Sequence, residues 1–223
     1  MKKKSPKVAI VANGEINNYA AAKAKIAEAN YLIACDGGLL HFNSLDATPH
    51  CLIGDFDSTP AKLLEAYKAQ GIPAFPFPTD KNDTDLALAV AHALMFAPES
   101  ITIVGASGGR VDHALGNIQL LAHIGENFGD TQAEIWDETT SIRLVHAQSC
   151  CEIFYTFPRE QYSTLSLLPL GTRATGITTR GLKYELENDT LRIGETRGIS
   201  NEFVENTAEI SVESGLLLVI RSK

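Results

Sequence analysis

Long hydrophobic runs are missing from this sequence. Although 44% of its residues are hydrophobic, no stretch approaches the ~20 consecutive apolar residues that a membrane helix requires. Three lysines, Lys2–Lys4, stand near the start, but the apolar run that follows, Val8–Ala12, is too short for the core of a secretory signal. We therefore expect a cytoplasmic protein that does not bind a membrane.

Cysteine pairs with the spacing of a metal or redox site are also missing. Cys35 and Cys51 lie inside apolar, strand-like runs, and Cys150 and Cys151 are adjacent, so no CxxC pattern occurs. A chain of 223 residues can bury a sufficient core without disulfides or a structural metal. We expect all four cysteines to be reduced.

Basic charge is scarce, with 19 Lys and Arg against 27 Asp and Glu and a formal net charge of −8. A nucleic-acid partner requires a basic surface, so we expect none. The phosphate loop GxxxxGK[ST] and the dinucleotide fingerprint are absent too. Any nucleotide site in this chain must be built in another way.

Up to about residue 140, short apolar runs alternate with segments of helical period. The expected strands are Lys7–Ala12, Tyr31–Cys35, Cys51–Ile53, Ile101–Val104 and Ala133–Trp136. The expected helices are Asn18–Ala29, Ala61–Gln70, Leu86–Ala97 and Ala114–Ile124. This alternation predicts βαβ units and a doubly wound, mostly parallel sheet with helices on both faces.

Beyond about residue 142 the pattern changes to short β-prone segments separated by turn residues. They are Cys151–Phe157, Ser163–Leu168, Thr190–Ile193, Glu209–Val212 and Leu216–Ile220. The pattern predicts an α/β domain over residues 1–141 and an all-β sandwich or barrel over residues 142–223.

Acidic and glycine-rich clusters follow the strands of the predicted α/β domain, where open parallel sheets bind ligands. Asp36-Gly37-Gly38 follows one strand, and Asp55 and Asp57 follow the next. Two residues apart on an extended backbone, the latter two carboxylates would lie on one side. Carboxylates at a strand end favour Mg²⁺ together with phosphate oxygens.

A third acidic cluster runs from Asp80 to Asp85, immediately before an expected helix. Asp83 or Thr84 is a good helix N-cap, and Asp85 would favour the positive end of the helix. Capping accounts for one or two of these acids but not for three within six residues, whose repulsion a cation would relieve. Capping and metal binding both stay open for this segment.

A glycine-rich turn, Gly105–Gly109, follows a further strand and leads into Arg110, Asp112 and His113, with Asn117 one helical turn later. Glycines let backbone N–H groups approach phosphates, and an arginine can fork onto phosphate oxygens. The alternative is a turn that serves only chain reversal. Together the clusters indicate a phosphoryl- or nucleotidyl-transfer enzyme with an acidic Mg²⁺ site.

In their order along the chain, these motifs resemble the thiamine pyrophosphokinase family. The matching segments are Asp36-Gly37-Gly38, Gly54–Ser58, the acidic run ending in Thr84-Asp85, Gly108–His113 with Asn117, and, nearer the C-terminus, Gly176–Tyr184 and Gly198–Glu202. The resemblance implies an α/β nucleotide-binding domain, a β-sandwich domain, and a homodimer whose active sites lie between the α/β domain of one subunit and the β domain of the other.

The resemblance also implies the reaction: the β,γ-diphosphate of ATP passes to the hydroxyl of thiamine, giving thiamine diphosphate and AMP, with Mg²⁺ as cofactor. The implied catalytic residues are Asp55, Asp57, Asp85 and Arg110, and the implied metal ligands are Asp55, Asp57, Asp80 and Asp85. The implied ATP contacts are Asp36, Gly37, Gly38, Gly108, Gly109, Arg110, Asp112, His113 and Asn117. The implied thiamine contacts are Tyr184, Ser200 and Asn201.

Two positions depart from the family pattern, and two other functions fit parts of the sequence. Asn82 stands where the family has a middle carboxylate, and Tyr184 stands where it often has Trp, a stronger cation–π partner. Asp55-Phe-Asp57-Ser-Thr59 also matches the opening motif of haloacid-dehalogenase-type phosphatases. A non-catalytic sensor of nucleotide or thiamine diphosphate would use the acidic cluster for binding alone.

Overall fold

The computed structural model describes residues 5–80, 82–147 and 154–223. The chain divides into two compact units. The first, called here the α/β unit, comprises the residues up to Leu120 together with Asp130–Glu138. The second, called the β unit, comprises Leu121–Gly129 and Thr139–Lys223. Cys150, Cys151 and the start of the expected strand Cys151–Phe157 lie outside the described residues.

The α/β unit contains a parallel sheet in the order β6-β5-β1-β2-β3-β4. The strands are β1 Lys7–Val11, β2 Tyr31–Cys35, β3 Cys51–Gly54, β4 Ala74–Pro76, β5 Ser100–Val104 and β6 Gln132–Trp136. The central strands are apolar along most of their length because both faces of the sheet are covered.

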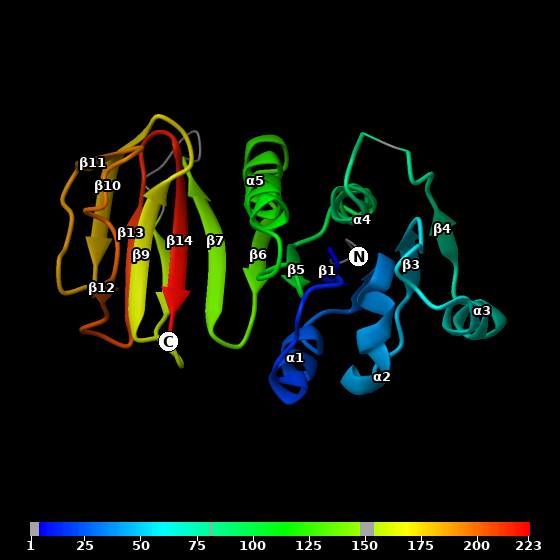
Figure 1. Cartoon of the computed structure of the whole chain (residues 1–223). Helices are drawn as coiled ribbons and strands as arrows, with labels where there is room; N and C mark the ends of the chain where they lie inside the picture. The colour runs from blue at the N-terminus through cyan, green and yellow to red at the C-terminus, as the bar shows by residue number, and fades with distance from the viewer. Residues whose placement is uncertain (1–4, 81, 148–153) are drawn as a thin grey trace. The chain divides into compact units, whose positions relative to one another are not determined.

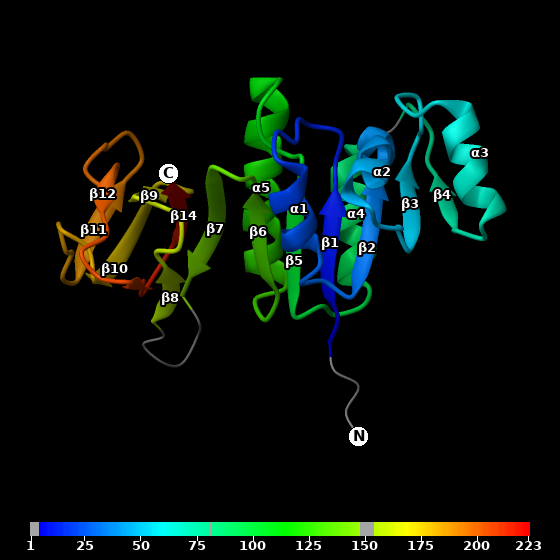
Figure 2. The same ribbon diagram turned by 90° about the horizontal axis from the view of Figure 1, so that it is seen from below.

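Helices lie on both faces of this sheet. They are α1 Tyr19–Ile26, the 3₁₀ helix η1 Asp36–His41, α2 Phe42–Leu45, α3 Ala61–Ala69, α4 Asp85–Leu94 and α5 Val111–Asn127. Helices α1 and α2 lie on one face, and α4 and α5 on the other (Figures 1 and 2). The change of face accompanies the return of the chain from the edge strand β4 to β5, which pairs with the other side of β1. The strand order therefore reverses between β1 and β5, which is the point where such sheets bind ligands.

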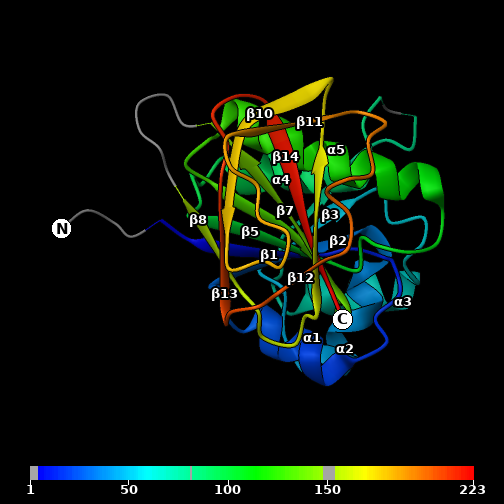
Figure 3. The same ribbon diagram turned by 90° about the vertical axis from the view of Figure 1, so that its left-hand side faces the viewer.

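The β unit consists of antiparallel strands in two sheets that share one core (Figure 3). One has the order β12-β9-β14-β7, with bounds Asn201–Glu202, Thr164–Pro169, Leu216–Ser222 and Thr140–His146. The other has the order β11-β10-β13-β8, with bounds Asp189–Arg192, Arg173–Arg180, Thr207–Ser211 and Tyr155–Pro158. Leu167 and Val219 of the first sheet and Phe157 and Ile210 of the second belong to the same buried cluster, as in a β-sandwich.

The predicted fold class is confirmed, but some elements were missed. The sequence did not indicate β4, η1, α2, β7, β10 or β12. The predicted boundary between residues 141 and 142 falls inside β7, whereas the last of the three unit boundaries along the chain lies between Glu138 and Thr139. Among the described residues, no helix is both long and apolar enough to cross a membrane.

Candidate active site

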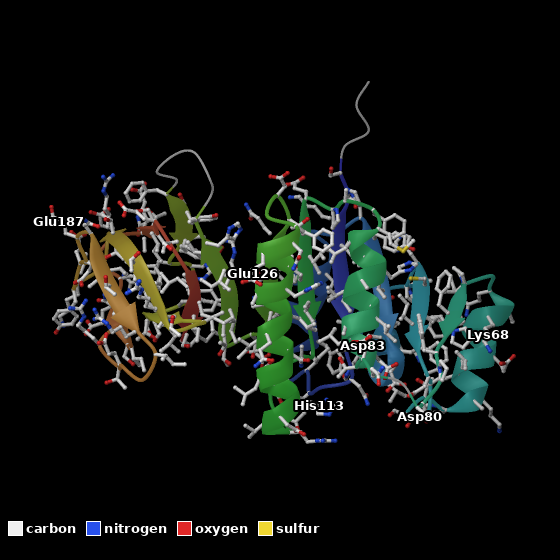
Figure 4. The ribbon with its side chains drawn as sticks, turned by 90° about the horizontal axis from the view of Figure 1, so that it is seen from above. Lys68, Asp80, Asp83, His113, Glu126 and Glu187 are labelled. Atoms are coloured by element: carbon white, nitrogen blue, oxygen red, sulfur yellow. The ribbon has the colours of Figure 1, made fainter. Side chains whose placement is uncertain are left out.

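A cleft of about 630 Å³ opens at the carboxyl ends of the strands of the α/β unit. Its lining comes from the segments after β1, β2, β3 and β5 and from the first turns of α4 and α5: Ala12, Asn13, Gly14, Cys35, Asp36, Asp55, Asp57, Ser58, Thr79, Asp83, Thr84, Asp85, Leu86, Gly105–Arg110, His113 and Asn117. Figure 4 shows Asp83 and His113 at the same end of this unit, where α4 and α5 begin. The cleft thus occupies the reversal of strand order.

Three carboxylates converge in this cleft. Asp36, Asp55 and Asp57, called here the acidic group, each offer an oxygen atom, and these atoms lie within 4.8 Å of one another. They converge because β2 and β3 are neighbours and end at the same edge of the sheet. The expected extended backbone between Asp55 and Asp57 is wrong: Phe56 has φ +62°, and the amide of Asp57 donates to Oδ1 of Asp55 at 3.2 Å. A tight turn, not a strand, brings the two carboxylates together.

Asp36 is the most constrained member of the acidic group. Its backbone has φ +47°, and its Oδ1 is buried with no hydrogen-bond partner among the described residues. Burial raises the pKa of this carboxyl above its ordinary value and outweighs hydrogen bonds from the Gly37 backbone and the Ser58 side chain, which lower it; the charges of Asp85 and Asp55 add to the increase. A carboxylate that has one buried oxygen without a donor and lies close to two other carboxylates is suited to binding a cation.

At the start of α4 the structure shows the helix cap and a contact with the acidic group, while metal binding by this segment stays a prediction. Thr84 is the N-cap of α4, and its hydroxyl accepts from the amide of Ala87 at 3.2 Å. Asp85 occupies the first turn, and its Oδ1 accepts from the amide of Asp55 at 3.1 Å, which joins α4 to the acidic group. Asp83 lines the cleft, whereas Asp80 is not among the lining residues.

The glycine loop, Gly105–Gly109, lines the cleft on the other side of β1 from the acidic group. Gly105, Gly108 and Gly109 have φ of +71°, +80° and +65°, which favours glycine at each position. A Cβ at Gly105 would lie 2.6 Å from the carbonyl oxygen of Ala12, while Gly108 and Gly109 have open surroundings. The second half of the loop therefore exposes its backbone to a ligand.

Arg110 and Asp112 form an exposed ion pair beside this loop. The guanidinium donates twice to the carboxylate, from Nε at 3.1 Å and from Nη2 at 2.6 Å. The hydrogen bond from Arg110 lowers the pKa of Asp112 to about 2. Arg110 and His113 line the cleft, but Asp112 does not. Asp112 thus holds the guanidinium at the rim of the cleft.

Gly37 and Gly38 have a packing role that the sequence did not reveal. Both are buried in η1, outside the cleft lining. A Cβ at Gly37 would lie 2.4 Å from the side chain of Asn13, and one at Gly38 would lie 2.0 Å from the carbonyl oxygen of Val11. These glycines let η1 pack directly against the end of β1, from which the cleft begins.

In the β unit, two of the expected thiamine contacts are joined by hydrogen bonds. The amide of Tyr184 donates to Oδ1 of Asn201 at 3.0 Å, and Nδ2 of Asn201 donates back to the carbonyl of Tyr184 at 2.8 Å. Asn201 is buried, whereas the Tyr184 side chain is 64% exposed. Ser200, the residue before Asn201, has φ +58°, and its amide donates to Oγ of Ser166 at 2.9 Å. Asn201 therefore fixes the turn that presents the tyrosine ring.

Comparison with known proteins assigns both parts of the chain. The family model described as thiamin pyrophosphokinase, catalytic domain, matches residues 22–133, and the one described as thiamin pyrophosphokinase, vitamin B1 binding domain, matches residues 155–217. The chain belongs to the thiamin pyrophosphokinase family. A thiamine pyrophosphokinase from Bacillus subtilis (strain 168) is 31% identical over 195 residues, which cover 85% of this chain and 86% of that protein.

Solved structures from the same family are similar over nearly the whole chain. The crystal structure of thiamine pyrophosphokinase from Bacillus subtilis matches with a TM-score of 0.84 at 27% identity, covering 97% of this chain and 99% of the other. A thiamin pyrophosphokinase family protein from Enterococcus faecalis matches with a TM-score of 0.78 at 30% identity, covering 97% and 99%. The family membership and enzyme class expected from the sequence are confirmed, and neither the phosphatase nor the sensor is supported.

Proposed function

We propose that this chain transfers the β,γ-diphosphate of ATP to the hydroxyl of thiamine, giving thiamine diphosphate and AMP. The observation that carries the proposal is the cleft in which the acidic group faces a glycine loop and an arginine, in a chain of the thiamin pyrophosphokinase family. A diphosphate in such a cleft meets a backbone free to donate hydrogen bonds on one wall and carboxylates that need a cation on the other.

The acidic group fits Mg²⁺, because all its potential ligands are hard carboxylate oxygens and the Asp36 carboxylate has one oxygen that is buried without a donor among the described residues. Asp55, Asp57 and Asp85 would hold the ion, with Asp36 as an additional ligand; Asp80 stays a prediction as a ligand. When bound, Mg²⁺ would neutralise part of the negative charge on the phosphate oxygens.

Around the phosphates, the chain supplies hydrogen-bond donors. The exposed amides of Gly108 and Gly109 bind phosphate oxygens, and the start of α5 adds the positive end of a helix of 17 residues. Arg110 forks onto the transferred group and stabilises the charge that develops there. To do so it exchanges a carboxylate partner, Asp112, for a phosphate. His113 and Asn117 line the same wall.

In this proposal, thiamine binds to the β unit. Its cationic ring stacks on the exposed ring of Tyr184, and Ser200 and Asn201 provide polar contacts. The proposal includes a homodimer with active sites shared between subunits, as the sequence resemblance implies, and a cytoplasmic location.

The test is an assay of the purified chain with ATP, Mg²⁺ and thiamine that quantifies AMP and thiamine diphosphate by chromatography. We expect the two products in equal amounts, and neither when thiamine is left out or the metal is chelated. Release of inorganic phosphate without thiamine, or ATP binding without any AMP, would refute the proposed reaction.

A further inference from the structure

In the glycine loop, Gly105, Ala106 and Ser107 are held by hydrogen bonds, whereas Gly108 and Gly109 have open surroundings. The carbonyl of Gly105 accepts from the amide of Gly14 at 2.8 Å, and the carbonyl of Ala106 accepts from Nδ2 of Asn117, also at 2.8 Å. The next residue, Ser107, donates its hydroxyl proton to Oδ2 of Asp137 at 2.7 Å. These side-chain contacts end where the open glycines begin. Ser107 is thus the anchored residue nearest to the backbone amides that bind phosphate.

The two partners of this hydrogen bond differ in how directly the sheet supports them. Ser107 lies three residues beyond β5, and Asp137 directly follows β6. The two strands pair in parallel up to Val104 and Trp136, which are both buried. The position of the Asp137 carboxylate is therefore set by the sheet, whereas Gly108 and Gly109, both at positive φ, give the second half of the loop more conformational freedom.

The chemistry of the contact determines what Ser107 can do. A carboxylate only accepts hydrogen bonds, and a serine hydroxyl has a single proton. While that proton is given to Asp137, it is not available to a phosphate oxygen. A short hydrogen bond to an ionised acceptor is also stronger than one between neutral groups.

We propose that Asp137 is a positioning residue for the nucleotide: by accepting the hydrogen bond from Ser107, it fixes the glycine loop in the conformation that binds the phosphates of ATP. Asp137 is not part of the cleft lining, so it acts through the loop and not by touching the ligand. The inference rests on the proposed function only in that ATP is the ligand of the cleft.

In this proposal Asp137 acts by fixing the conformation of the glycine loop, and its negative charge is not required. Asp137→Ala removes the acceptor and leaves the loop to order itself during binding. Asp137→Asn keeps an oxygen that accepts from Ser107 and removes a negative charge near a site for an anion. The two variants therefore affect ATP binding differently, which a general loss of structure would not produce.

The experiment is calorimetric titration of the full-length chain with ATP and Mg²⁺ in the absence of thiamine. We expect Asp137→Ala and Ser107→Ala each to raise the Kd for ATP about tenfold, the scale of one lost hydrogen bond to a charged group. Asp137→Asn should stay within about twofold of wild type. In the double variant Asp137→Ala/Ser107→Ala, the increase in Kd should be clearly smaller than the product of the two single increases, because both changes remove the same contact.

Glu138→Ala, at the neighbouring acidic residue, is the matched control and should bind ATP like wild type. The thermal midpoint of each variant reports folding. If Asp137→Ala does not fold, the Kd values of Ser107→Ala and Asp137→Asn for ATP test the proposal. Equal losses in Asp137→Asn and Asp137→Ala, a normal Kd in Ser107→Ala, or losses that multiply in the double variant would each overturn the proposal. Failure of the proposed function would show separately, as a wild-type chain that makes no thiamine diphosphate.

Discussion

At the scale of single residues, Asp57 is a position where a substitution should affect turnover without affecting stability. Its side chain is exposed, its carboxylate accepts from the hydroxyl of Ser58 at 2.9 Å, and it belongs to the acidic group. An exposed carboxylate close to two others contributes little to folding, because the repulsion among them opposes any local hydrogen bond.

We therefore expect Asp57→Asn to lower kcat by about 10²- to 10³-fold, the usual cost of removing a group that stabilises developing charge. Its free energy of unfolding should stay within about 0.5 kcal/mol of wild type. Steady-state kinetics and urea denaturation measure the two quantities. Glu65→Gln, on α3, is a control for loss of an exposed carboxylate and should leave kcat unchanged. Normal turnover in a folded Asp57→Asn variant would remove Asp57 from the metal site.

Residue types predicted the acidic site, but not its full membership. Asp55 and Asp57 are visible in the sequence because they follow a buried strand. Asp36 was expected to contact ATP, and its place in the acidic group depends on the pairing of β2 with β3 and on a positive φ. Asp137 carried no signal, because its partner Ser107 is 30 residues away and belongs to the preceding strand–loop segment.

At the scale of elements, two glycines show opposite consequences of adding one methyl group. Gly38 lies in η1, where a Cβ would stand 2.0 Å from the carbonyl oxygen of Val11, a backbone atom that cannot move aside. Gly116 lies in the middle of α5, where a Cβ would meet nothing within 4 Å. Neither glycine has a positive φ, so the difference expected between the two alanine substitutions comes from what surrounds each position.

We expect Gly38→Ala to lower the free energy of unfolding by about 3 kcal/mol or more, the upper range for an overpacked core. Gly116→Ala should raise it by about 0.5–1 kcal/mol, because alanine loses less backbone entropy in a helix. Chemical denaturation of both variants gives the two values. A neutral Gly38→Ala variant would mean that η1 does not pack as closely on β1 as described.

Strongly periodic elements were predictable, and short or interrupted ones were not. The predicted bounds of β2 agree with the structure at both ends, and those of β1, β3, α3 and α4 differ by a few residues. β4 has only three residues, too few for a pattern. β10 contains Gly176, with φ +65°, and its register shifts there, so the alternation that marks a strand is broken.

At the scale of the whole molecule, the chain passes between the units more often than a two-domain sequence pattern suggests. It leaves the α/β unit after Leu120, contributes Leu121–Gly129 to the β unit, returns for Asp130–Glu138, and then completes the β unit. The helix α5 therefore belongs to both. Its first ten residues carry Asn117, which anchors the glycine loop, and a helix of that length is marginal alone.

This shared helix leads us to expect that the two units unfold together, and Arg221 offers the test. Arg221 is a β-unit residue, only 5% exposed, that donates to the carbonyl of Pro158 at 2.8 Å and to Oγ of Ser141 at 2.9 Å. Truncation to alanine removes both of these hydrogen bonds and leaves a cavity in their place. Arg221→Ala should therefore lower the free energy of unfolding by about 2–4 kcal/mol.

The sole tryptophan, Trp136, is buried in the α/β unit, so its fluorescence follows a part of the chain distant in sequence from Arg221. In urea, we expect Arg221→Ala to shift the fluorescence transition and the circular-dichroism transition by the same amount, and the exposed Arg173→Ala to shift neither. A fluorescence transition left in place while circular dichroism moves would show that the α/β unit unfolds independently. The continuity of α5 would then have no energetic consequence, because loss of its second half would leave the fold around the glycine loop intact.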